Sequence, residues 1–111
     1  MKQDAKEKIK KVYVCSPLSG DIEENIKKAR EHCRAVSLKG FLPIASHIYF
    51  TQFLDDNSLE ERNIGMDMGL ELLKLCDEVW VFGDRISEGM KKEIEFAKEL
   101  NIKIKFKNIT S

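Results

Sequence analysis

The stretch that decides the fold is Asp77–Leu100, DEVWVFGDRISEGMKKEIEFAKEL. Its first part, EVWVFG at residues 78–83, is a short apolar run that predicts a buried strand. A polar loop follows at residues 84–87, and apolar residues then recur at the spacing of a helix. Glu93 breaks this pattern, because it points near the middle of the apolar stripe. A carboxylate in such a position normally has a partner or a function.

The rest of the chain repeats this alternation of strand and helix. Asp21 with Glu24, and Ser58 with Glu61, resemble capping boxes at the starts of two further helices. Gly40 and Asn101 are expected to close the first and last helices, and residues 46–57 are predicted to form a long loop. Strands are predicted at residues 10–15, 41–45, 78–83 and 102–106, and three helices at about 22–39, 59–75 and 88–100.

This order predicts a three-layer α/β fold, a flavodoxin-like or Rossmann-like doubly wound sheet of four parallel strands. We expect the first strand to lie between the second and third, with the fourth outside the third. Residues 1–9 are expected to be a frayed N-terminus, and residues 10–107 a single domain. The ligand crevice should then lie beyond the carboxyl ends of the first and third strands.

The composition of the chain limits the classes of partner. Of 111 residues, 42% are hydrophobic and 34% are charged, with a formal net charge of zero, so no strongly basic surface for nucleic acid is indicated. The three cysteines are an odd number without a CxxC pair, which indicates neither a disulfide framework nor a zinc site. Without a membrane-length apolar run or a signal peptide, the sequence predicts a cytoplasmic protein that needs no metal or organic cofactor.

Two loops are expected to meet in the crevice, residues 15–20 and 83–89. Each precedes a helix N-terminus, whose free N–H groups favour an anion. Ser16, Ser19 and Ser87 add hydroxyl donors, so the crevice suits a phosphate or a carboxylate. The alternative for Ser87 is that it only caps its helix. The chain has neither a P-loop nor a G-x-G-x-x-G motif, so ATP chemistry and a dinucleotide site are not supported.

Glu93 and Tyr13 are the candidate catalytic side chains. A carboxylate placed like Glu93 can act as a nucleophile at a sugar carbon or as a general base. The alternative is a structural carboxylate paired with Arg62 or a lysine. Tyr13 is predicted to face the helical layer opposite to that of Val12 and Val14, with its hydroxyl near the strand end. The alternative for Tyr13 is an ordinary core aromatic.

Other side chains also have two interpretations. Arg62 can reach an anion in the crevice, or pack its aliphatic stem against the helix. His47 can contact a ligand or be a structural loop histidine, and Trp80 is predicted to be a core residue. The aromatic residues of the predicted loop can cover a base or form a subunit contact; they are Tyr49, Phe50 and Phe53.

Three patterns together resemble the nucleoside 2-deoxyribosyltransferase superfamily, which includes the deoxynucleoside 5′-monophosphate N-hydrolases. The first is Tyr13 on a strand that ends in a small-residue loop. The second is LELLKLCD at residues 70–77, leading into VWVF at residues 79–82, and the third is SEGMKKE at residues 87–93. The resemblance covers residues from about 10 to 106 and is strongest to a small bacterial and phage branch near the N-hydrolases.

The resemblance implies a role for individual residues. Glu93 would attack the anomeric carbon of the sugar, Tyr13 would orient it, and Ser87 would bind a 5′-phosphate. The substrate-binding set that we predict is Ser16, Pro17, Ser19, Gly20, His47, Arg62, Gly83, Ser87, Gly89 and Met90.

One position departs from the family pattern. The acidic residue that the family carries before the third strand falls here on Gly69, with Asp67 two residues earlier. On pattern alone Asp67 is a solvated residue, but we predict it as a third catalytic residue if the helix is set differently. A protein that kept the nucleotide pocket and lost turnover would show the same departure.

The leading hypothesis is therefore an enzyme, an N-glycosidase or deoxyribosyltransferase that acts through Glu93 on a (deoxy)nucleoside 5′-monophosphate-like substrate. The alternatives are a non-catalytic sensor or sequestering protein for a nucleotide or ADP-ribose-like ligand, and a structural domain that only associates with itself or a partner. Related folds complete their pockets across a subunit interface, so the resemblance implies a homodimer or a higher homo-oligomer.

Overall fold

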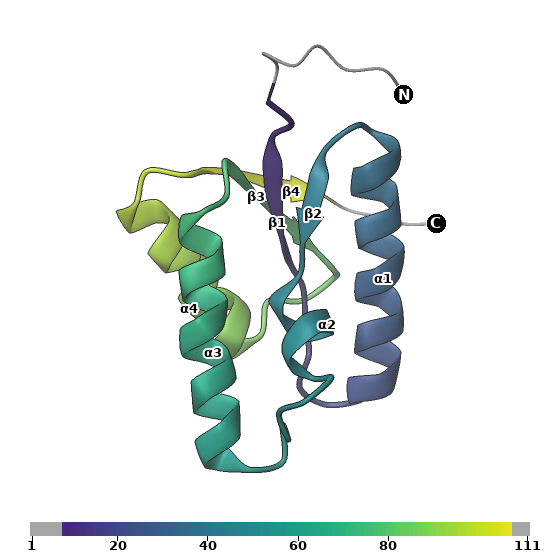
Figure 1. Ribbon diagram of the computed structural model, residues 1–111, viewed down its shortest axis with the longest axis vertical. Helices are drawn as coiled ribbons and strands as arrows, with labels where there is room; N and C mark the ends of the chain where they lie inside the picture. The colour runs from purple at the N-terminus through teal and green to yellow at the C-terminus, as the bar shows by residue number, and fades with distance from the viewer. Residues whose placement is uncertain (1–7, 108–111) are drawn as a thin grey trace.

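The computed structural model describes residues 8–107, so the predicted frayed N-terminus falls mostly outside the described residues. Strands and helices alternate along this range (Figure 1). Their bounds are β1 (Lys11–Cys15), α1 (Ile22–Leu38), β2 (Leu42–Ile44), α2 (Ser46–Phe50), α3 (Leu59–Lys74), β3 (Glu78–Phe82), α4 (Glu88–Glu99) and β4 (Lys103–Lys107).

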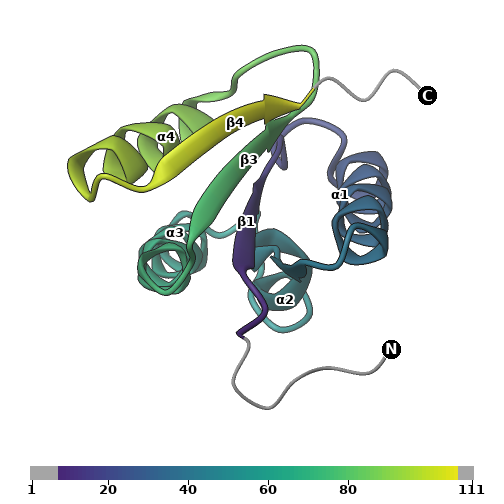
Figure 2. The ribbon, with the colours of Figure 1, turned by 90° about the horizontal axis from the view of Figure 1, so that it is seen from above.

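The four strands form one parallel sheet in the order β2-β1-β3-β4, as predicted. Figure 2 shows α1 on one side of this sheet and α3 and α4 on the other, which is the three-layer, doubly wound arrangement expected from the sequence. Pro43 lies in β2, an edge strand, where its missing N–H breaks no ladder on the open side. The expected fold class is confirmed.

The two faces of β1 supply the two halves of the core. Tyr13 and Cys15 pack with residues of α3 and α4, whereas Val12 and Val14 pack on the face that α1 covers. All four side chains are buried, because successive residues of a central strand point into opposite layers. This alternation directs the Tyr13 hydroxyl toward the helical layer that contains Glu93.

The predicted helix ends agree with the structure. The side chain of Asp21 accepts a hydrogen bond from the Glu24 backbone N–H at 3.2 Å, and that of Ser58 accepts one from the Glu61 N–H at 3.3 Å. Gly40 has a φ of +91° beyond the end of α1, a conformation that suits glycine at a helix terminus.

The segment after β2 differs from the prediction, because residues 46–50 form the short helix α2 within the expected long loop. A five-residue helix is too short to show a 3.6-residue period, and its N-cap Ala45 makes no side-chain capping bond. Tertiary packing fixes it instead, since α2 contacts both α1 and α3 and its Ser46 and His47 are buried. The structure thus has four helices in the described range rather than three.

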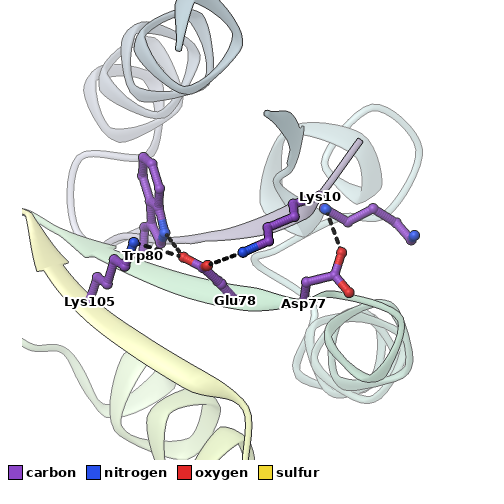
Figure 3. A network of polar contacts seen from close by, with 6 residues as sticks. Lys10, Asp77, Glu78, Trp80 and Lys105 are labelled. Carbon is purple, nitrogen blue, oxygen red and sulfur yellow. Dashed lines mark hydrogen bonds and ion pairs between the residues drawn. The ribbon is translucent and has the colours of Figure 1, made fainter. Parts of the chain in front are cut away.

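A buried carboxylate links β3 to β4 and to the residue that precedes β1 (Figure 3). Glu78 of β3 accepts a hydrogen bond from Trp80 Nε1 at 2.8 Å. The same carboxylate forms ion pairs with Lys105 of β4 at 3.2 Å and with Lys10, just before β1, at 3.5 Å. Trp80 is 2% exposed, which confirms its core position.

The structure describes all three cysteines and the length of each helix. Cys15, Cys33 and Cys76 are free thiols; Cys15 and Cys76 are buried and Cys33 is half-buried. No helix in the described part of the chain is long and apolar enough to cross a membrane.

Candidate functional site

A pocket opens beyond the carboxyl ends of β1 and β3, where the sequence places the crevice. It is formed by the loop after β1, by α2 and the segment that follows it, by α3 and by the start of α4. Its volume is about 810 Å³ when the open space at its mouth is included.

Glu93 and Tyr13 meet at this pocket. Glu93 lines it from α4, and the Tyr13 hydroxyl donates a hydrogen bond to Glu93 Oε2 at 2.5 Å. The same hydroxyl lies 2.7 Å from the Oγ atom of Ser46, the first residue of α2. Tyr13 itself is fully buried, so these two oxygens are its polar surroundings.

The surroundings of Glu93 change its ionisation. Burial raises the pKa of Glu93 to about 7, and hydrogen bonds with Tyr13 and Cys15 lower it and offset part of that rise. Burial, followed by the charge of Glu93, holds the pKa of Tyr13 well above its usual value, so Tyr13 remains a hydrogen-bond donor. Near neutral pH the Glu93 carboxyl is therefore divided between its acid and its carboxylate forms.

Glu93 has neutral partners rather than the cation considered in the alternative interpretation. Within residues 8–107, no ion pair joins Glu93 to Arg62 or to a lysine. Burial and the nearby Glu93 raise the pKa of Cys15, so its thiol is also uncharged. A carboxylate that faces a pocket and is held by a hydroxyl can attack an electrophilic carbon.

Ser16 and His47 form a second polar pair in the pocket. Ser16 Oγ lies 3.1 Å from His47 Nε2, and both residues are buried and line the pocket. Burial, assisted by the nearby His32, lowers the pKa of His47 to about 4. The imidazole is thus neutral at physiological pH, with one nitrogen that donates and one that accepts hydrogen bonds.

Gly69 of α3 lies directly against the Tyr13–Ser46 contact. A Cβ atom at Gly69 would lie 3.0 Å from Ser46 Oγ and 3.4 Å from the Tyr13 hydroxyl oxygen. A side chain at the position where the resemblance places an acid would thus press against Ser46, which would have to shift. Asp67 is exposed and is not among the residues that line the pocket.

The loops after β1 and β3 touch, as expected from the topology. A Cβ atom at Gly83, whose φ is +109°, would lie 3.3 Å from Pro17 Cδ. Arg85 Nη2 donates to the Ser19 carbonyl oxygen at 3.4 Å. Ser19 lines the pocket, whereas Pro17, Gly20 and Gly83 support the loops from outside its lining.

The start of α4 forms another wall of the pocket. Ser87 caps this helix by accepting a hydrogen bond from the Met90 N–H at 3.3 Å, and it also lines the pocket. Gly89 and Met90 line the pocket beside it. Arg62 lines the pocket from α3 and is exposed; it makes no ion pair within the described range.

Several lining residues were not predicted from the sequence. Ser46 could not be identified, because the short helix that orients it leaves no periodic pattern in the sequence. The other unpredicted lining residues are Leu18, Thr51, Leu54, Asp56, Glu61, Gly65, Met66 and Leu70.

Among residues 8–107, no group of three His, Cys, Asp or Glu side chains could hold a metal ion.

Comparison with known proteins gives a family. Residues 10–107 match the family described as "Domain of unknown function (DUF7768)". The chain belongs to this family. A search of curated proteins found no match.

A solved structure shares the fold. A 2-deoxyribosyltransferase from the psychrotolerant bacterium Bacillus psychrosaccharolyticus is similar with a TM-score of 0.70 and 19% sequence identity. The similarity covers 88% of this chain and 72% of the other. It shows a related α/β fold, as the resemblance implied; the branch near the N-hydrolases stays a prediction.

Proposed function

We propose that this protein cleaves or transfers at the N-glycosidic bond of a nucleoside-like substrate, with Glu93 as the nucleophile. The observation that carries the proposal is the Glu93 carboxyl, which lines the pocket and is held by the buried Tyr13 hydroxyl at 2.5 Å. The related structure supports it, since that protein is named a 2-deoxyribosyltransferase and described as a biocatalyst for the synthesis of nucleosides.

The proposed reaction has two steps. In the first, an ionised oxygen of Glu93 forms a bond to the anomeric carbon, while the bond from that carbon to the base nitrogen breaks. The bonding electrons leave with the base, which takes up a proton. In the second step, water releases the sugar from Glu93 in hydrolysis, or a second base replaces Glu93 in transfer. Tyr13 orients the carboxylate throughout.

For the substrate, we propose a (deoxy)nucleoside 5′-monophosphate or a close analogue. Ser16, Ser19 and Ser87 bring hydroxyl groups to the pocket beside the N-terminus of α4, whose amides favour an anion. Arg62 adds a positive charge to the pocket lining from α3. We do not propose a catalytic role for Asp67, since it lies outside the pocket lining.

The second candidate function is a non-catalytic sensor or sequestering protein for a nucleotide or ADP-ribose-like ligand. The observation that favours it is Gly69, because α3 carries a glycine rather than an acid beside Tyr13. The pocket and its hydroxyl groups would serve such a protein equally well.

Base release decides between the candidates. Purified protein is incubated with deoxynucleosides and their 5′-monophosphates, and free base is measured by chromatography. The enzyme hypothesis predicts release that Glu93→Gln abolishes and Glu95→Gln retains, since Glu95 is an exposed acid of the same helix. Nucleotide binding by calorimetry without base release would support the sensor. If no nucleotide binds or raises the melting temperature, both fail and a structural domain remains.

We also propose a homodimer and a cytoplasmic location. Helix α3 supports the dimer, because Ile64, Met68 and the C-cap residue Leu75 are exposed and lie on one stripe. The location rests on the three free cysteines, which suit a reducing compartment.

A further inference from the structure

The Tyr13 hydroxyl has two oxygen neighbours but only one hydrogen to donate. That hydrogen goes to Glu93 Oε2 at 2.5 Å, the shorter contact and the one to a carboxyl group. The second contact, 2.7 Å to Ser46 Oγ, then requires the serine hydroxyl to be the donor and the tyrosine oxygen to be the acceptor. The three side chains form a directed chain from Ser46 through Tyr13 to Glu93.

We infer that Ser46 is a positioning residue that acts on Glu93 through Tyr13, and that Gly69 lacks a side chain to leave room for the Ser46 hydroxyl. The inference rests on the proposed function only where it treats Glu93 as the nucleophile. The hydrogen-bond chain and its effect on Glu93 exist whether or not the protein is an enzyme.

Burial makes this chain effective. Tyr13 is fully buried and Ser46 is 7% exposed, so water does not replace either hydrogen bond. A donor to the tyrosine oxygen polarises its O–H bond, and the polarised hydroxyl is a better donor to the carboxylate. In agreement, the hydrogen bond from Ser46 acts to lower the pKa of Tyr13. The ionised form of Glu93, which attacks carbon, is the form that benefits.

The hydrogen-bond chain matters because no cationic side chain among residues 8–107 forms an ion pair with Glu93. Cys15 is an uncharged thiol and His47 a neutral imidazole at physiological pH. Tyr13 and Cys15 are the titratable groups that hydrogen-bond with Glu93. The other titratable or charged groups that line the pocket with it are His47, Asp56, Glu61 and Arg62.

The absence of a side chain at Gly69 leaves space for the Ser46 hydroxyl. A methyl group there would lie 3.0 Å from Ser46 Oγ and 3.3 Å from Ser46 Cβ, closer than normal van der Waals contact. Ser46 would have to shift by a few tenths of an ångström, which would disturb the contact between its hydroxyl and Tyr13. A side chain at position 69 therefore crowds the Ser46 hydroxyl.

The test measures the ionisation of Glu93 directly. The protein is labelled with ¹³C at the glutamate side-chain carboxyl, the Glu93 signal is assigned by its loss in Glu93→Gln, and it is titrated by NMR. In Ser46→Ala, the pKa of Glu93 is expected to rise by about half a pH unit or more, because a hydrogen bond that favours its charged form is lost. Ser16→Ala removes another buried pocket hydroxyl that does not contact Tyr13, and it should leave this pKa unchanged.

A double-mutant cycle shows whether Ser46 acts through Tyr13. Tyr13→Phe alone should raise the pKa of Glu93, and adding Ser46→Ala to Tyr13→Phe should then change it no further. Gly69→Ala should raise the pKa as Ser46→Ala does, and its effect should shrink in the Ser46→Ala background. Melting curves of each variant establish that it is folded.

Two results would overturn the inference. One is a Glu93 pKa that is the same in Ser46→Ala and in the wild type. The other is a shift that persists fully in the Tyr13→Phe background, which would mean that Ser46 acts without Tyr13. Because the titration needs no substrate, its outcome is independent of base release. A pKa shift without base release would refute the enzyme and leave the role of Ser46 intact.

Discussion

At the scale of single residues, Glu93 lies where a leucine or alanine would stabilise the protein more. Burial raises its pKa from about 4.5 to about 7 in the folded state. Between these two values the folded protein holds a proton that the unfolded chain has released. The contribution of Glu93 to the free energy of unfolding therefore falls as the pH rises through this window. The hydrogen bond from Tyr13 offsets part of this loss of stability. The rest of the loss is the cost of keeping a reactive carboxylate at a functional site.

The first prediction follows from this fall in stability with rising pH. Glu93→Gln should stabilise the protein by on the order of 2 kcal/mol at pH 8, and by almost nothing at pH 4, where Glu93 is protonated in both states. Denaturant titrations of both proteins at the two pH values measure the difference. His47 destabilises the folded state as the pH falls below its unfolded pKa, but it does so equally in both proteins and cancels.

Glu95→Gln is the control for this prediction, because Glu95 is an exposed acid of the same helix. It should change stability little at either pH. A gain from Glu93→Gln that is the same at pH 4 and pH 8 would contradict the expected ionisation of Glu93.

The rate of base release should also depend on the ionisation of Glu93, but here ionisation raises the rate whereas it lowers the stability. The nucleophile must be ionised, so kcat/KM for the proposed reaction should rise with pH up to about 7 and then level off. Steady-state rates from pH 5 to pH 9 measure this limb. A rate that is flat between pH 5 and pH 7 would show that Glu93 is ionised throughout, or that it is not the nucleophile.

At the scale of helices and strands, long periodic elements could be predicted from the sequence and short ones could not. The twelve-residue α4 shows its apolar stripe in the sequence, so the inward direction of Glu93 is predictable. Tyr13 could be placed because β1 alternates between its two helical layers. Ser46 could not, because α2 has five residues and takes its position from contacts with α1 and α3. The directions of Glu93 and Tyr13 were therefore predictable, their pairing was implied only by the family resemblance, and Ser46 was not predicted.

Glu78 gives the prediction at this scale, because its carboxylate links β3 to β4 and to the start of β1. Hydrogen bonding from Trp80, followed by that from Lys105, lowers the pKa of Glu78 despite its burial. Such a group stabilises the folded state above its unfolded pKa and loses that effect as the pH falls through its folded pKa. Glu78→Gln should therefore destabilise the protein by about 1–2 kcal/mol at pH 7, and by less at pH 3.

Denaturant unfolding followed by the fluorescence of Trp80, the one tryptophan of the chain, measures this difference. Glu99→Gln is the matched control, since Glu99 is an exposed glutamate of α4. A loss of stability from Glu78→Gln that stays constant down to pH 3 would show that packing, rather than charge, accounts for the effect.

At the scale of the whole molecule, α3 has apolar residues on two sides. Gly69 and Leu73 face the core, whereas Ile64, Met68 and Leu75 are 42%, 45% and 64% exposed. The exposed residues are separated by four and seven positions, so they form one stripe along the helix. A helix that is apolar on its outer side as well normally packs against something. The zero net charge of the chain also leaves self-association unopposed.

The last prediction is that this stripe joins two copies of the protein. Sedimentation velocity should give a dimer for the wild type and a monomer for Met68→Glu, because the substitution places a charge in a desolvated contact. Leu38→Glu is the matched control: Leu38 is 70% exposed on α1, on the opposite side of the sheet, and its substitution should leave the dimer intact. A monomeric wild type, or equal dissociation by both variants, would exclude α3 as the interface. If the partner completes the pocket, base release should fall in parallel with the fraction of dimer as the protein is diluted.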